Sequence, residues 1–349
     1  MLDRVLTRRI ANAVAKGGRN GSAATALPGD LAAICEDARQ RVVAYTGLNP
    51  ATALPPAEAV ERSIWIAANV ESMGALLDPL GDRLTGGLGI MRGPLRSAAG
   101  ALISAEAGAL TGYLSQRVLG QYEFVLVDPA SVPRLLFVAP NISHAAQRLD
   151  ADPEELLTWI AFHEVTHAVQ FAGVAWLRPH LAGLVLELME SLEVSVDPRA
   201  MLRAPAVGDL RERFEALREG GLVAAIAGPD RRVLLDRMQC VMAVIEGHAE
   251  HVMDVVGAAA LPSLAELRSA LDRRRRERSP LLALLERLIG LDAKLRQYET
   301  GKAFCDGVVA EAGPAALHRI FDGPEQLPNL AELDDAAAWL HRTGAATTA

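Results

Sequence analysis

The chain has 349 residues, half of them hydrophobic, and a formal net charge of −8 at neutral pH. This acidic balance argues against a nucleic-acid partner bound through a general basic surface, because binding to phosphates requires an excess of Lys and Arg. Aromatic residues make up only 4% of the chain, so the core must be built mainly from Ala, Leu and Val, and Ala and Leu favour helices.

The cysteines and the N-terminal region both predict a cytoplasmic protein. The three cysteines, Cys35, Cys240 and Cys305, lie far apart and form no CxxC pair, so neither a disulfide framework nor a thiolate zinc site is indicated. Residues 1–20 contain no apolar run of roughly 7 to 15 residues of the kind that a secretory signal requires. Charged residues interrupt the small-residue segment 86–112, so no stable insertion into a membrane is expected.

The first third of the chain is predicted to be helical, and two strands follow it. Residues 1–29 are expected to form an N-terminal helix and a Gly-rich flexible junction. Residues 30–120 form a helical subdomain in this prediction, because their apolar residues recur at spacings of three and four. The short β-favouring segments EFVLVD (123–128) and RLLFVAP (134–140) are separated by a Pro-containing turn, which predicts a hairpin.

A strong helix start signal follows these strands. Asp152 is a good N-cap, Pro153 suits the first helical position, and Glu155 is placed to complete a capping box. The helix that begins here is predicted to carry the sequence AFHEVTHAVQF at 161–171.

The remaining segments complete a prediction of a mainly α protein with a small β-hairpin or sheet. Residues 121–260 are expected to form a metal-binding core that contains a helical insertion at 172–230. Residues 261–349 are expected to form a C-terminal helical subdomain.

The HEVTH motif is typical of a zinc site that activates water. His163 and His167 are four residues apart, so both project from one face of a helix and can grip a single ion. Glu164 can reach a water molecule on that ion, whose pKa zinc lowers towards about 7, and can accept its proton. The competing interpretation is a pair of histidines that are satisfied by packing within a helix interface.

A catalytic zinc normally needs a third protein ligand, and the downstream segment IEGHAEHVMD (245–254) is the candidate source. Here Glu246, Glu250 and Asp254 recur every four residues and form one stripe of a helix. Acidic residues on an otherwise apolar helix are costly to bury without a cation or hydrogen-bond donors. A solvated acidic stripe is the alternative reading.

The two segments together resemble a known family. HEVTHAVQF followed by EGHAEHVMD is similar to gluzincin-type metallopeptidases, in which a downstream Glu-Gly supplies the third ligand. More closely, the chain resembles the zincin-like metallopeptidase type 2 family, a largely actinobacterial group with one branch labelled as associated with biosynthesis of the deazaflavin coenzyme. The resemblance extends to four further segments: VVAYTGLNP, SIWIAANVESMGALLDPL, RLLFVAPNI and LDAKLRQYETGKAF.

The resemblance implies a zincin-like metallopeptidase architecture with Zn2+ as its cofactor. It implies three zinc ligands: His163, His167 and Glu246. It also implies that Glu164 is the general base, and we expect Glu250 to orient a ligand imidazole. An alternative register, in which Glu250 is the ligand and Asp254 supports it, remains open.

A hydrolytic site also needs a donor for the oxyanion that develops in the transition state. The candidates are Tyr298, which lies in the segment KLRQYETGK, and the two histidines His248 and His251. The strand RLLFVAP is expected to offer a free edge to an extended peptide.

Two functions from different classes follow from the sequence. The first is a zinc-dependent metallohydrolase, a peptidase or amidase acting on an unidentified peptide or amide substrate. The alternative is a metal-stabilised helical scaffold or binding protein without hydrolytic activity. The intact motif favours the enzyme, because a purely structural zinc has no need of Glu164.

Overall fold

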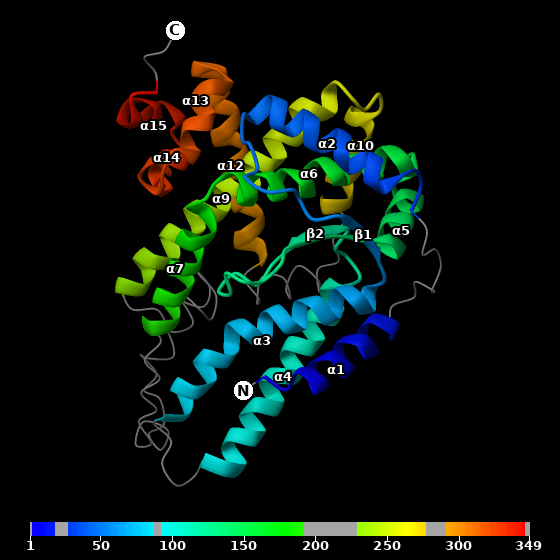
Figure 1. Cartoon of the computed structure of the whole chain (residues 1–349), viewed down its shortest axis with the longest axis vertical. Coiled ribbons are helices and arrows are strands. Elements are labelled where there is room, and N and C mark those ends of the chain that lie inside the picture. The colour runs from blue at the N-terminus through cyan, green and yellow to red at the C-terminus, as the bar shows by residue number, and fades with distance from the viewer. Residues whose placement is uncertain (1, 18–26, 87–91, 192–228, 277–290, 346–349) are drawn as a thin grey trace. The chain divides into compact units, whose positions relative to one another are not determined.

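The predicted fold class, mainly helical with a small sheet, is confirmed. The predicted insertion 172–230 falls largely outside the described residues. The computed structural model describes five stretches of the chain (Figure 1): residues 2–17, 27–86, 92–191, 229–276 and 291–345. By its contacts the chain divides into two compact units, Met1–Gly173 with Val256–Leu267, and Val174–Val255 with Arg268–Ala349.

The first unit contains a three-stranded sheet in the order β1-β3-β2. Its strands are β1 (Ala57–Val60), β2 (Gly120–Glu123) and β3 (Arg134–Val138). β3 is the central strand, because it pairs in parallel with β1 and antiparallel with β2. Both edges of β3 are therefore covered, and the prediction that RLLFVAP offers a free edge to a peptide is wrong.

The predicted antiparallel pairing is present, but its first strand ends earlier than expected. The strand covers Gly120–Glu123 instead of 123–128. Beyond it, the Val125 amide donates to the Ser131 hydroxyl at 3.1 Å, and the Asp128 carboxylate accepts from the Ala130 amide at 3.0 Å. These local side-chain bonds favour a turn and compete with a strand ladder.

β1 lies within the region that the sequence predicts to be helical. Its residues Ala57–Val60 read AEAV, and Ala and Glu are depleted in strands. The strand forms because β3 supplies a parallel partner far away in the sequence, with Ala57 opposite Leu135 and Val60 opposite Val138. Such pairing leaves no local signal.

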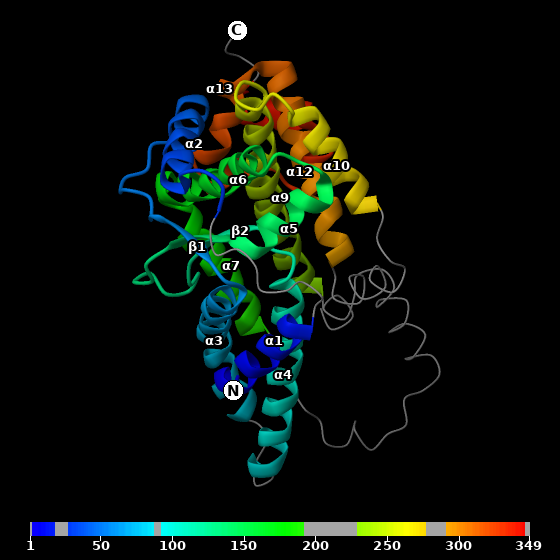
Figure 2. The ribbon, with the colours of Figure 1, turned by 90° about the vertical axis from the view of Figure 1, so that its right-hand side faces the viewer.

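In the described part of the first unit, the helices α1 to α6 accompany the sheet. α1 packs on α4 and α3, whereas α2 packs on α6, and both views place the sheet between α6 and α3 (Figures 1 and 2). Among the described residues, no helix combines the length and the apolar character needed to cross a membrane. The helices are α1 (Arg4–Gly17), α2 (Leu31–Thr46), α3 (Arg62–Gly86), α4 (Arg92–Leu114), α5 (Ala139–Leu149) and α6 (Pro153–Gly173).

α6 begins where the sequence predicts. The Asp152 carboxylate accepts hydrogen bonds from the amides of Glu154 and Glu155, each at 2.9 Å. Glu155 does not close the expected capping box, because its carboxylate accepts from the amide and hydroxyl of Ser263. α6 also packs on β2, β3 and α5, and this packing fixes the helix against the sheet.

The second unit is helical throughout its described residues. Its core gathers Phe304, Leu317, Ile320 and Trp339, each at most 2% exposed. Trp339 packs edge-on against Phe304, with ring centroids 5.5 Å apart. The helices that contribute to the unit are α7 (Leu177–Ser191), α9 (Pro229–Ala258), α10 (Leu264–Arg276), α12 (Leu291–Ala312), α13 (Pro314–His318), α14 (Leu330–Leu333) and α15 (Ala336–Thr343). Two short 3-10 turns lie at Arg319–Phe321 and Pro324–Gln326.

Candidate metal centre

α6 brings two imidazole rings together in the way that the HEVTH spacing predicts. The Nε2 atoms of His163 and His167 lie 3.1 Å apart, and the rings meet nearly at right angles, with centroids 4.6 Å apart. Two nitrogen ligands of a tetrahedral zinc would lie about 3.3 Å apart, given Zn–N bonds of roughly 2.0–2.1 Å. The nitrogen pair therefore fits one ion.

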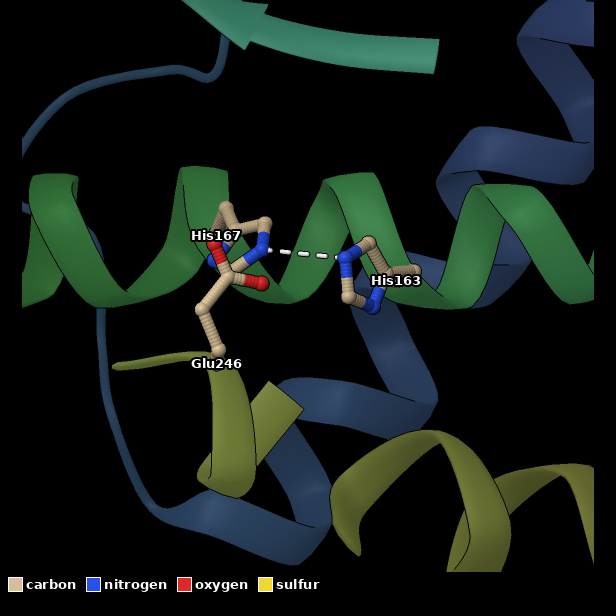
Figure 3. Close-up of side chains that lie close together, drawn as sticks. All are labelled: His163, His167 and Glu246. Carbon is tan, nitrogen blue, oxygen red and sulfur yellow. Dashed lines mark hydrogen bonds between the residues drawn. The ribbon is translucent and has the colours of Figure 1, made fainter. Parts of the chain in front are cut away.

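A carboxylate from α9 completes the group. One ligand atom from each of His163, His167 and Glu246 can be chosen so that all three lie within 4.8 Å of one another (Figure 3). All three side chains are half-buried, and the part of the chain that the structure describes contains no second such group of potential ligands. Two imidazoles and a carboxylate are donors that suit a divalent metal ion, and three ligands leave a coordination position for water.

Gln170 holds one of the two rings, and the sequence-based prediction missed it. Its side chain is fully buried, and its Oε1 accepts a hydrogen bond from Nδ1 of His167 at 3.0 Å. This bond places the ring proton on Nδ1 and leaves the Nε2 lone pair for a metal. The available signal was a polar residue three positions after His167, which is within reach on a helix.

We expect Gln170→Leu to weaken metal binding by about 10- to 100-fold, because residues that orient ligand imidazoles contribute on that scale. The measurement is a zinc competition titration against a chromophoric chelator. Thr166→Val is the matched control: Thr166 is equally buried on the same helix, but its hydroxyl donates to the Phe162 carbonyl. Wild-type affinity in the Leu variant would contradict the assigned role of Gln170.

Glu164 directly follows His163 on α6, and its side chain lies against strand β2 of the sheet. Its side chain is 7% exposed, and Oε2 accepts a hydrogen bond from the backbone amide of Tyr122 in β2 at 3.0 Å. Burial, and then the charge of Glu164, raise the pKa of the Cys35 thiol to about 12. Cys35 therefore stays protonated at neutral pH and supplies no thiolate to this region.

The helix that carries Glu246 is held by a contact between glycines. A Cβ added to Gly247 would lie 2.1 Å from the backbone carbon of Gly301 in α12. A Cβ added to Gly301 would lie 2.0 Å from the backbone oxygen of Ala243. The backbones of α9 and α12 thus touch next to Glu246, and a side chain at either glycine would force them apart.

The other acidic residues of the α9 stripe have different surroundings. Asp254 forms ion pairs with Arg268 and with Lys302, the latter at 3.2 Å. Burial raises the pKa of Asp254, although the two cations oppose the shift. Glu250 is not a member of the group formed by the two histidines and Glu246, and its role in orienting a ligand stays a prediction.

Two of the candidate oxyanion donors, His248 and His251, have identified partners within the second unit, and their proposed role stays a prediction. The ring of His248 packs edge-on against Phe321 at 4.8 Å, and Nδ1 of His251 lies 2.6 Å from a carboxylate oxygen of Asp306. At about 100° per residue, these two histidines lie roughly 200° and 140° around α9 from Glu246. The side chain of the third candidate, Tyr298, is outside the described residues, and its role stays a prediction.

Comparisons with known proteins give one family and one structure. A family model described as zincin-like metallopeptidase matches residues 2–340. No curated protein matches the chain. A crystal structure from Chloroflexus aurantiacus, described as a "putative hydrolase with a novel fold", is 27% identical to the chain, with a TM-score of 0.70 and coverage of 99% of both chains.

Proposed function

The chain belongs to the zincin-like metallopeptidase family, and from this premise we propose that it is a zinc-dependent metallohydrolase, a peptidase or amidase, with Glu164 as its general base. The observation that carries the proposal is the convergence of His163, His167 and Glu246, with a buried carboxylate directly after the first histidine. The likeness to a structure described as a hydrolase supports the same reaction class.

In this proposal the ligands bind the metal and the general base transfers the proton. When bound, zinc supplies Lewis acidity, polarising a substrate carbonyl and lowering the pKa of a coordinated water. The two Nε2 atoms and the Glu246 carboxylate would hold the ion, and Gln170 fixes the ring of His167. Glu164 accepts the proton of the attacking water at its carboxylate and later donates it to the leaving amine.

The number of ligands separates catalysis from a structural role. Structural zinc sites are almost always closed by four protein ligands, whereas catalytic sites have three and keep one position for water. Among the described residues, the potential ligands number three, which supports a catalytic rather than a structural role for the metal. The alternative function, a scaffold that binds metal but hydrolyses nothing, is therefore the one that an experiment must exclude.

The first experiment is elemental analysis of protein purified without chelators, followed by incubation with a peptide library and mass spectrometry. We expect about one zinc per chain and cleavage that a chelator stops and added zinc restores. A folded protein without metal would contradict the site. A zinc-loaded protein that cleaves no peptide or amide would make the chain a metal-stabilised scaffold.

The third ligand can be tested on α9 itself. We expect Glu246→Ala to weaken zinc binding by more than about 100-fold, because it removes a ligand and exceeds the effect of a supporting residue. Glu250→Ala, one helical turn away, should stay within about 10-fold of wild type. Both are measured by zinc competition titration, with thermal unfolding as the folding control. The reverse order would assign Glu250 as the ligand.

A further inference from the structure

The carboxylate of Glu164 occupies the outer edge of strand β2. In an antiparallel pair, successive residues alternate between facing the partner strand and facing away. The carbonyl of Leu119 faces β3, because it accepts from the Val138 amide at 2.8 Å. The amide of Tyr122 consequently points away from β3, and there it donates to Glu164 at 3.0 Å.

The same carboxylate fills the place of a missing side chain at Gly120. A Cβ added there would lie 2.6 Å from Cγ of Glu164, 2.9 Å from Oε1 and 3.0 Å from Cδ. The three nearest atoms all belong to one side chain. Real Cβ atoms essentially never come closer than about 3.0 Å to another heavy atom, so Glu164 would have to move if residue 120 had a side chain.

The backbone gives no other reason for a glycine at position 120. The glycines with positive φ among the described residues are Gly29, Gly47, Gly313 and Gly344, and Gly120 is not one of them. A glycine inside a strand weakens that strand, and it often marks a place where another group approaches closely. The close approach here is that of Glu164.

We propose that Gly120 is a positioning residue for the general base: with the Tyr122 amide it forms a seat that fixes the Glu164 carboxylate against β2, on the helix that carries His163 and His167. The inference rests on the proposed function, because it concerns the base of that reaction. It assigns β2 a part in catalysis that the metal ligands do not supply. The seat holds Glu164 from the side of the sheet, whereas the ion would be held by other residues.

The test compares Gly120→Ala with Gly183→Ala, a glycine of α7 around which a Cβ would find open space. We expect Gly120→Ala to lower kcat by about 10²-fold, the effect of displacing a catalytic group by roughly 1 Å. KM and the zinc content should stay at wild-type values, because neither the ligands nor the ion are touched. Gly183→Ala should match wild type in all three measurements.

A double-mutant cycle tests the contact without any substrate. Gly120→Ala should lower Tm in the wild-type background but not in the Glu164→Ala background, because the atoms that crowd the new Cβ are then gone. The double variant should fold even where Gly120→Ala alone does not. An equal loss of Tm in both backgrounds, or a double variant that fails to fold, would overturn the inference.

Failure of this inference differs from failure of the proposed function. A wild-type protein without turnover would overturn the proposed function, and the catalytic role of Gly120 with it. Wild-type turnover that Gly120→Ala leaves unchanged would overturn only the role of Gly120. A Gly120→Ala variant that loses zinc in proportion to activity would also overturn it, because the residue would then act on metal binding.

Discussion

Replacing Glu164 with Gln is expected to abolish hydrolysis and to leave the metal bound. The amide has the size and shape of the carboxylate, and its oxygen can still accept the Tyr122 amide hydrogen in the space above Gly120. It cannot accept a proton from water, and general bases contribute about 10²- to 10⁴-fold to rates. The measurement is kcat on a cleaved library peptide, together with the zinc content of the variant.

Glu123→Gln is the matched control for this change. Glu123 is also 7% exposed and belongs to β2, but its carboxylate accepts from the hydroxyl of Ser72. We expect this variant to retain wild-type kcat. If Glu164→Gln turned over substrate at the wild-type rate, Glu164 would not be the base; equal losses in both variants would indicate a general sensitivity of β2 to a neutral amide.

Removing both imidazoles, as His163→Ala with His167→Ala, is expected to eliminate metal binding and activity together. Only one of the three grouped ligands would remain, and one carboxylate does not hold zinc at micromolar concentrations. The loss is read by elemental analysis. It is also read by stability, since a ligand present at about 100 times its Kd stabilises the folded state by roughly 2.7 kcal/mol.

The stability readout gives this experiment its control. A chelator should lower Tm of the wild-type protein and leave Tm of the double variant unchanged. His341→Ala, at an exposed position on α15, should respond to the chelator as wild type does. A double variant that still contains one zinc per chain would mean that the metal is held elsewhere.

The features that could be predicted from the sequence are those that depend on near neighbours. The start of α6 was predicted because its N-cap, Asp152, acts on amides two and three residues away. That His163 and His167 project from the same face of α6 follows from helix geometry alone. β1 was missed because its partner strand lies far along the chain, and its own residues carry no strand preference.

The same distinction holds within the candidate site. Gln170 was within reach of sequence reasoning, since it lies one turn from His167 on the same helix. The seat of Glu164 was not, because the amide of Tyr122 comes from 42 residues away and a backbone donor leaves no trace in residue types. Gly120 gives no such signal either, because the side chain that fills the space beside it comes from another element.

The glycine contact between α9 and α12 restricts how α9 can move against its partner. With the two backbones touching at Gly247 and Gly301, a slide of α9 by one turn would bring either Ala243 or His251 into the position that Gly247 occupies. Each of these residues has a Cβ that would clash with the backbone of α12, so α9 cannot slide by one turn in either direction. The backbone at Glu246, next to this contact, is thereby held against α12, and metal binding has little backbone entropy to remove from this part of α9.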